Sequence, residues 1–195
     1  MRSAALATPL AIPLAVSIAI PAALAPIESS LAAVTGAGPG GFVTVHETTI
    51  QAPRVDVWQA MVAVSDWWSS DHTIAGDAGN LAIELEPLGC FCERLGDKGD
   101  VVHMTVTFVN HGVILRLTGG LGPLGLMGVS GNMTWELFDG DAGDTTEARF
   151  TYAVGGYYPD GLDSIAPAVD YVIGEALQRL KARIETGDAD NVALD

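Results

Sequence analysis

The sequence predicts an α+β domain in which a curved antiparallel sheet of about seven strands wraps around one long C-terminal helix. Two observations predict this fold. Between residues 81 and 154, six segments with apolar residues at alternate positions follow one another, separated mostly by short turns rich in Gly, Pro and Asn. After them, residues 162–184 place their apolar side chains on one stripe at helical spacing.

The elements follow a simple order along the chain. We expect a strand at 42–50, a helix at 54–63 that begins after Pro53, and a short helical turn at 65–70. Strands at 81–86, 90–95, 100–109 and 113–118 should form an antiparallel meander. A glycine-rich apolar loop at 119–128 precedes the last two strands, at 129–138 and 145–154, and the helix at 162–184 closes the domain.

Both ends of the chain differ in composition from this domain. Residues 1–25 begin with Arg2, continue as an uncharged apolar run and end in Ala23-Leu24-Ala25, which is the layout of a secretory signal peptide. We therefore expect an exported protein, periplasmic or secreted, with an uncleaved anchor as the alternative. Cleavage is expected after Ala25 or Ala32. Residues 26–41 are expected to be a flexible spacer, 42–185 the folded domain and 186–195 an acidic tail.

Composition excludes several functions. The chain has 195 residues, with 9 basic and 24 acidic side chains and a formal net charge of -15. Such a charge repels phosphate backbones and argues against nucleic-acid binding. A hydrophobic content of 49% excludes a chain that is disordered throughout. No stable membrane span is expected once the signal peptide is removed, and the oligomeric state is left open.

The order of elements resembles the START-like, or SRPBCC, superfamily over about residues 42–185. That group includes polyketide cyclases, lipid-transfer START domains and homologues of the heat-shock ATPase activator. The chain most resembles exported bacterial members with a GCFCER-type strand. The resemblance implies a helix-grip fold with a deep apolar cavity between the sheet and the long helix. It is carried by Ile50-Gln51-Ala52-Pro53 with Val57-Trp58, Trp67-Trp68 with His72, the GCFCER segment 89–94, and Leu121-Gly122-Pro123-Leu124.

Strand alternation assigns side chains to the two faces of the sheet. The more apolar face, which includes Val102 and Phe108, is expected to point inward, and His103 is expected on the opposite face. Glu93 is a carboxylate on the inward face, where it either pairs at a strand end or offers a polar group to a ligand. The residues expected to contact a ligand are Trp67, Trp68, His72, Glu93, Met104, Met127, Met133, Trp135, Phe150 and Tyr152.

The two cysteines leave three alternatives open. Pairing arithmetic places Glu84, Cys92 and His103 in one row on the outer face, with Cys90 beside them, and this set could hold zinc or copper. Cys90 and Cys92 could instead form a disulfide in an oxidising compartment. The default expectation is two reduced, partly covered thiols and no metal.

Three functions are compatible with these features. The leading hypothesis is an exported carrier that binds a small apolar or amphipathic ligand, without a cofactor and without covalent chemistry. The second is an enzyme of cyclase, dehydratase or hydrolase type, in which Glu93 and His72 act as general acid and base and must converge on one pocket. The third is a protein-interaction module like the heat-shock ATPase activator homologues.

Overall fold

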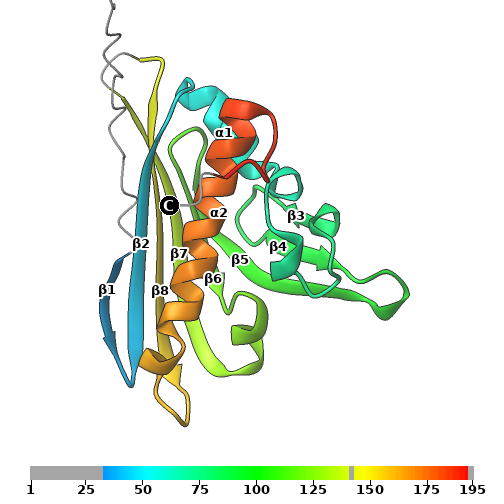
Figure 1. Cartoon of the computed structure of the whole chain (residues 1–195). Coiled ribbons are helices and arrows are strands. Elements are labelled where there is room, and N and C mark those ends of the chain that lie inside the picture. The colour runs from blue at the N-terminus through cyan, green and yellow to red at the C-terminus, as the bar shows by residue number, and fades with distance from the viewer. Residues whose placement is uncertain (1–32, 141–142, 193–195) are drawn as a thin grey trace, which may run out of the picture.

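The computed structural model describes residues 33–140 and 143–192 (Figure 1). The expected signal peptide, 1–25, and both expected cleavage points lie outside the described residues. Among the residues that are described, no helix is both long and apolar enough to cross a bilayer.

One antiparallel sheet forms the body of the domain. Its order is β1-β2-β8-β7-β6-β5-β4-β3, so β2 pairs with β8 and the later strands follow as a meander. Within residues 33–140 and 143–192 it has eight strands where about seven were expected, because β1 lies in the segment expected to be a spacer. The strands are β1 (Ala33–Gly38), β2 (Gly41–Ile50), β3 (Leu81–Ile83), β4 (Cys90–Arg94), β5 (Asp100–Asn110), β6 (Ile114–Gly119), β7 (Gly128–Asp139) and β8 (Thr146–Tyr157).

In the described part of the chain, two α-helices cover the sheet, and the longer one lies along its concave side (Figure 1). Helix α1 (Arg54–Val62) follows β2, and α2 (Ala166–Thr186) ends the domain. Pro167 stands at the start of α2, where its missing N–H is harmless. Gly187 ends the helix in the left-handed conformation, with its N–H on the Arg183 carbonyl at 3.1 Å. Short 3-10 turns connect the rest: η1 (Val64–Asp66), η2 (Ser70–His72), η3 (Ala78–Asn80), η4 (Gly96–Lys98), η5 (Gly122–Leu126) and η6 (Leu162–Ser164).

Aromatic rings fill the space between the sheet and the helices. Trp135 and Phe150 stack with ring centroids 4.8 Å apart, and Trp67 meets Trp135 edge-on at 5.7 Å. Phe91 adds a further edge contact to Trp68 at 5.6 Å. Each of these five side chains is nearly or fully buried, so they form core.

The expected spacer and tail are more ordered than the sequence suggested. Residues 33–38 form β1, which pairs with β2, and the Pro39 carbonyl accepts a hydrogen bond from the Leu162 N–H at 3.0 Å. At the other end Ala189 is buried, and Asp190 pairs with Arg179 at 2.7 Å. The spacer expectation is therefore wrong for residues 33–41, and the tail packs against the domain as far as Asp190.

Two irregularities overturn the face assignment of β5. The register shifts between Phe91 and Cys92, so that Met104 pairs with Phe91 while Val102 pairs with Cys92. His103 is the extra residue of this bulge and turns inward, and Val102 becomes 62% exposed. A second shift occurs between Val106 and Phe108, and it leaves Phe108 exposed on the outer face. Strict alternation is therefore wrong for His103, Val102 and Phe108.

Candidate functional site

An apolar groove of about 370 Å³ lies beside the N-terminal half of α2. We call it the α2 groove. One wall is α2 itself, the second is the segment 71–74, and the third is residues 121–127 of the loop between β6 and β7. Trp68 also lines the groove. The size falls within the range of about 300–1,000 Å³ that is usual for small-molecule sites.

The helical wall follows from the sequence pattern of α2. Ile165, Ala168, Val169 and Val172 line the groove, and their spacing puts them on one face of the helix. The more deeply buried positions, such as Ile173 and Leu177, face the core instead. The apolar stripe of α2 is thus wide enough to pack on the sheet and still leave one edge for the groove.

Glu93 holds the second wall in place from below. Its side chain has no exposed surface, and its oxygens accept hydrogen bonds from the N–H groups of Ile74 and Ala75. His103 contacts the same carboxylate through Nε2 at 2.9 Å. Burial alone would raise the pKa of Glu93, but the two backbone donors and His103 outweigh it and hold the pKa below its ordinary value. The carboxylate is therefore an anchor for the 74–75 backbone.

Tyr152 holds the third wall in a similar way. Its hydroxyl accepts a hydrogen bond from the Leu121 N–H and donates one to the Gly119 carbonyl, both at 3.1 Å. Burial raises the pKa of Tyr152 to about 12, although the Leu121 N–H acts in the opposite direction. Gly120 has no room for a side chain, because a Cβ there would lie 2.7 Å from the Gly125 nitrogen. The loop is therefore folded tightly on itself and tied to the core.

A polar link closes one end of the groove. His72 lines the groove and its Nε2 lies 2.7 Å from an oxygen of Glu175, which joins η2 to α2. Glu175 follows Val172 by one turn, so the apolar stripe of the helical wall ends at a carboxylate. Tyr171 stands edge-on to His72, with ring centroids 6.1 Å apart.

The structure divides the expected ligand contacts into two groups. Trp68, His72 and Met127 line the α2 groove. The others are at most 1% exposed and belong to the core: Trp67, Glu93, Met104, Met133, Trp135, Phe150 and Tyr152. The inward side chains of the sheet thus fill the space beneath α2 and do not line the groove. Two of them, Glu93 and Tyr152, support the walls of the groove through hydrogen bonds.

Glu93 and His72 are not brought together as an acid–base pair. His72 faces the groove with Glu175 as its partner, whereas Glu93 lies beneath the 74–75 backbone and is bonded to His103. Sequence reasoning missed Glu175 as the partner of His72. The available signal was the acidic residue that interrupts the apolar stripe one turn after Val172.

The cysteine region also differs from expectation. Cys90 and Cys92 form a disulfide with their Cα atoms 5.3 Å apart, so the expectation of reduced thiols is wrong. Ala82, and not Glu84, pairs with Cys92, and His103 points to the opposite face. Of the four residues considered as metal ligands, Glu84 lies 3.7 Å from Cys90, but His103 does not join them. Within the described part of the chain, no group of three or more His, Cys, Asp or Glu side chains is arranged to hold a metal ion.

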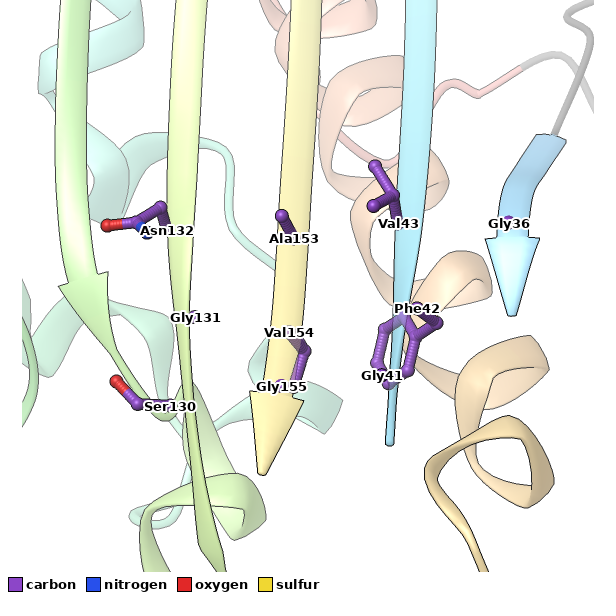
Figure 2. Close-up of a pocket in the computed structure, with 10 residues that line it drawn as sticks. All are labelled: Gly36, Gly41, Phe42, Val43, Ser130, Gly131, Asn132, Ala153, Val154 and Gly155. Atoms are coloured by element: carbon purple, nitrogen blue, oxygen red, sulfur yellow. The ribbon is translucent and has the colours of Figure 1, made fainter. Parts of the chain in front are cut away.

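A second hollow, of about 520 Å³, lies on the outer face of the sheet. Figure 2 shows it over β7, β8, β2 and β1, with α2 behind the strands. The hollow is lined by glycines that have no side chain to fill it: Gly41, Gly131 and Gly155. The polar side chains that line it are Ser130 and Asn132. No ionisable side chain lines this hollow among the described residues. The α2 groove, with its apolar walls and its polar end, is the better candidate site.

Comparison with known proteins bears on the fold. No protein-family model matches the sequence, and no curated protein matches it significantly. Among solved structures, EF2215 from Enterococcus faecalis matches with a TM-score of 0.54 at 18% identity, over 80% of this chain and 78% of that one. CalU16 from Micromonospora echinospora matches with a TM-score of 0.50 at 14% identity, over 76% of each chain. The fold is the helix-grip fold.

A third structure, DynU16 from the dynemicin biosynthetic locus, matches with a TM-score of 0.51 at 17% identity over 75% of this chain. This chain spans about half of DynU16, at 48% of its length. At such identities the likeness establishes the architecture alone. It agrees with the helix-grip fold that the SRPBCC resemblance implied, including the curved antiparallel sheet around a C-terminal helix.

Proposed function

We propose that the protein binds a small apolar or amphipathic molecule in the α2 groove. The observation that carries the proposal is the composition of the groove: apart from residues 71–73 and Gly122, every lining side chain is apolar. An apolar surface of this kind gains free energy when a ligand removes it from water. Burying about eight methylene groups would contribute about 6 kcal/mol to binding, from which the free-energy cost of association is subtracted.

The buried anchors support the same proposal. Glu93 and Tyr152 fix the backbone of two walls, so the groove exists before the ligand arrives and little ordering is needed on binding. The enzymatic alternative built on Glu93 and His72 finds no such support, because Glu93 does not reach the groove. We also propose export, for which the support is the signal-like segment 1–25.

Native mass spectrometry of the gently purified protein tests binding and export together. We expect a copurified small molecule that is lost on denaturation, and a mature chain that begins after Ala25 or Ala32. Ala168 is exposed and lines the groove, so A168W should fill the groove and abolish copurification. A82W, on the exposed side of edge strand β3, is the matched control and should retain the ligand. Equal ligand content in the two variants would overturn the proposed site.

A further inference from the structure

We infer that the α2 groove selects amphipathic molecules whose polar end is cationic, such as alkylamines or alkylammonium ions, and rejects those that end in a carboxylate. This inference rests on the proposed function, because it names the chemical class of ligand for the same groove.

The groove has one apolar end and one polar end. Its helical wall is apolar from Ile165 to Val172 and stops at Glu175, one turn further along α2. The opposite wall places Asp71, His72 and Thr73 at that same end, because His72 contacts Glu175 directly. An elongated ligand with one polar end therefore has a defined orientation, with its head group at residues 71–73.

The ionisable groups at the polar end leave a negative charge there. Asp71 lines the groove, and Glu175 has His72 as its one ion-pair partner within the described parts of the chain. None of the described lining residues is Lys or Arg. A carboxylate head would thus meet like charge in a partly enclosed site, whereas a cation would meet opposite charge.

Basic side chains further along α2 do not change this balance, because they are engaged elsewhere. Arg179 binds the Trp67 carbonyl at 2.9 Å and Asp190 at 2.7 Å. Lys181 pairs with Glu185 at 3.0 Å. Both residues lie beyond Glu175 along the helix, away from the apolar wall.

Aromatic rings at the polar end favour the same class of ligand. Trp68 lines the groove, and its indole N–H lies 3.4 Å from the His72 carbonyl. Tyr171 is 65% exposed and stands edge-on to His72. The faces of indole and phenol rings attract cations, and proteins commonly recognise quaternary ammonium ligands in this way. A carboxylate gains nothing from them.

The test compares three probes that share one alkyl chain: decylamine, decanol and decanoate, the two ions below their micellar concentrations and decanol below its solubility limit. Titration calorimetry at low ionic strength should give the tightest binding for decylamine and the weakest for decanoate, with Kd values at least about tenfold apart. High salt should narrow this gap, because it screens charge and leaves alkyl burial intact. Methylamine, which lacks the chain, should not compete with decanol.

Matched variants locate the charge effect. D71N should weaken decylamine binding about fivefold and change decanol binding much less, because decanol carries no charge. D97N makes the same change in net charge on the exposed η4 turn and should leave all three probes unchanged. Because Asp71 is exposed and outside the core, D71N should fold normally.

The outcomes separate this inference from the proposed function. If decanol binds, A168W abolishes that binding and the three probes have equal affinity, the ligand class is wrong while the binding groove stands. Tighter binding of decanoate than of decylamine would overturn the ligand class in the same way. If none of the three binds to the wild-type protein, both the inference and the proposed function fail.

Discussion

Glu93 and Tyr152 are polar side chains inside an apolar core, and the hydrogen bonds of each hold one wall of the α2 groove. Buried polar groups cost free energy unless they are paired, and removing one partner leaves the others unpaired. Single-atom changes at these two residues therefore test the architecture of the groove without altering its lining.

The first prediction concerns Glu93→Gln. The amide keeps the size of the side chain, but its NH₂ group cannot accept from the N–H of Ile74 or Ala75. We expect the free energy of unfolding in urea to fall by about 2–3 kcal/mol. Glu86→Gln, an exposed change on the same hairpin, should alter it by less than about 0.5 kcal/mol. A loss at Glu93 as small as that control would contradict its role as an anchor.

This difference between wild type and variant should depend on pH. The folded-state pKa of Glu93 lies below its ordinary value of 4.5, because hydrogen bonds to the ionised form outweigh burial. The stabilisation is therefore complete above that value and is lost as pH falls through the folded pKa. We expect a constant gap between wild type and Glu93→Gln near neutral pH, and a shrinking gap in more acidic solution. A gap that persists at the acid limit would show that charge is not its source.

Tyr152→Phe provides the second residue-scale prediction. Removing the hydroxyl leaves the Leu121 N–H and the Gly119 carbonyl without their partner, which should cost about 1–3 kcal/mol of stability. Hydrogen exchange at Leu121 should also become faster, because the loop loses its tie to the core. Unchanged exchange at Leu121 would contradict the proposed role of the hydroxyl.

Alkaline pH gives an independent check on Tyr152. The folded protein keeps the phenol proton until about pH 12, while the unfolded chain releases it near 10. Between these values the unfolded state binds fewer protons, so stability falls as pH rises. Over this interval the free energy of unfolding of the wild-type protein should fall by up to about 2 kcal/mol more than that of Tyr152→Phe. Parallel pH profiles for the two proteins would contradict a buried phenol.

At the scale of elements, α2 approaches β2 closely at Gly174. A Cβ at this position would lie 2.7 Å from Cε1 of His46. His46 is 2% exposed and its Nε2 is held at 2.9 Å from Asp170, so the ring has little room to move. Glycine inside a helix costs about 1 kcal/mol relative to alanine, and this close approach is the reason for its presence here.

Gly174→Ala should therefore destabilise the protein, although the same change at an open helix position would stabilise it. The expected loss is about 1–2 kcal/mol, the clash outweighing the gain in helix propensity. A double-mutant cycle with His46→Ala checks the cause, because without the imidazole ring the Gly174→Ala change should become neutral or favourable. The same loss in both backgrounds would place the clash elsewhere.

Elements also show what the sequence could predict. Apolar periodicity correctly placed α2 and the strands from 81 onward, because burial on one face imposes that period, and Val and Thr content placed β2. It failed at His103 because a bulge depends on how two strands pair. The alternation along one strand does not show how that strand pairs with its neighbour. The contact of Glu93 with residues 74–75 could not be predicted from periodicity either, because it joins a strand to an irregular loop whose sequence has no periodic pattern.

At the scale of the whole molecule, β1 is the edge strand that the sequence did not reveal. Its residues, AVTGAG, are small and show no apolar alternation, so they have the composition of a spacer. It stabilises the fold through its backbone, which pairs with β2 and covers one edge of the sheet. Val34 packs against the core, and Pro39 and Gly40 offer carbonyls to the N–H groups of Leu162 and Gly156.

Two shortened chains test this contribution, one beginning at Ala33 and one at Gly41. The chain without β1 uncovers the edge of β2 and removes the acceptors of the Leu162 and Gly156 N–H groups. We expect its free energy of unfolding to be lower by about 2–3 kcal/mol, from lost burial of Val34 and lost hydrogen bonds. It should also self-associate in size-exclusion chromatography, because an open strand edge pairs with other chains. Equal stability and a monomeric state for both chains would mean that 33–40 is a spacer after all.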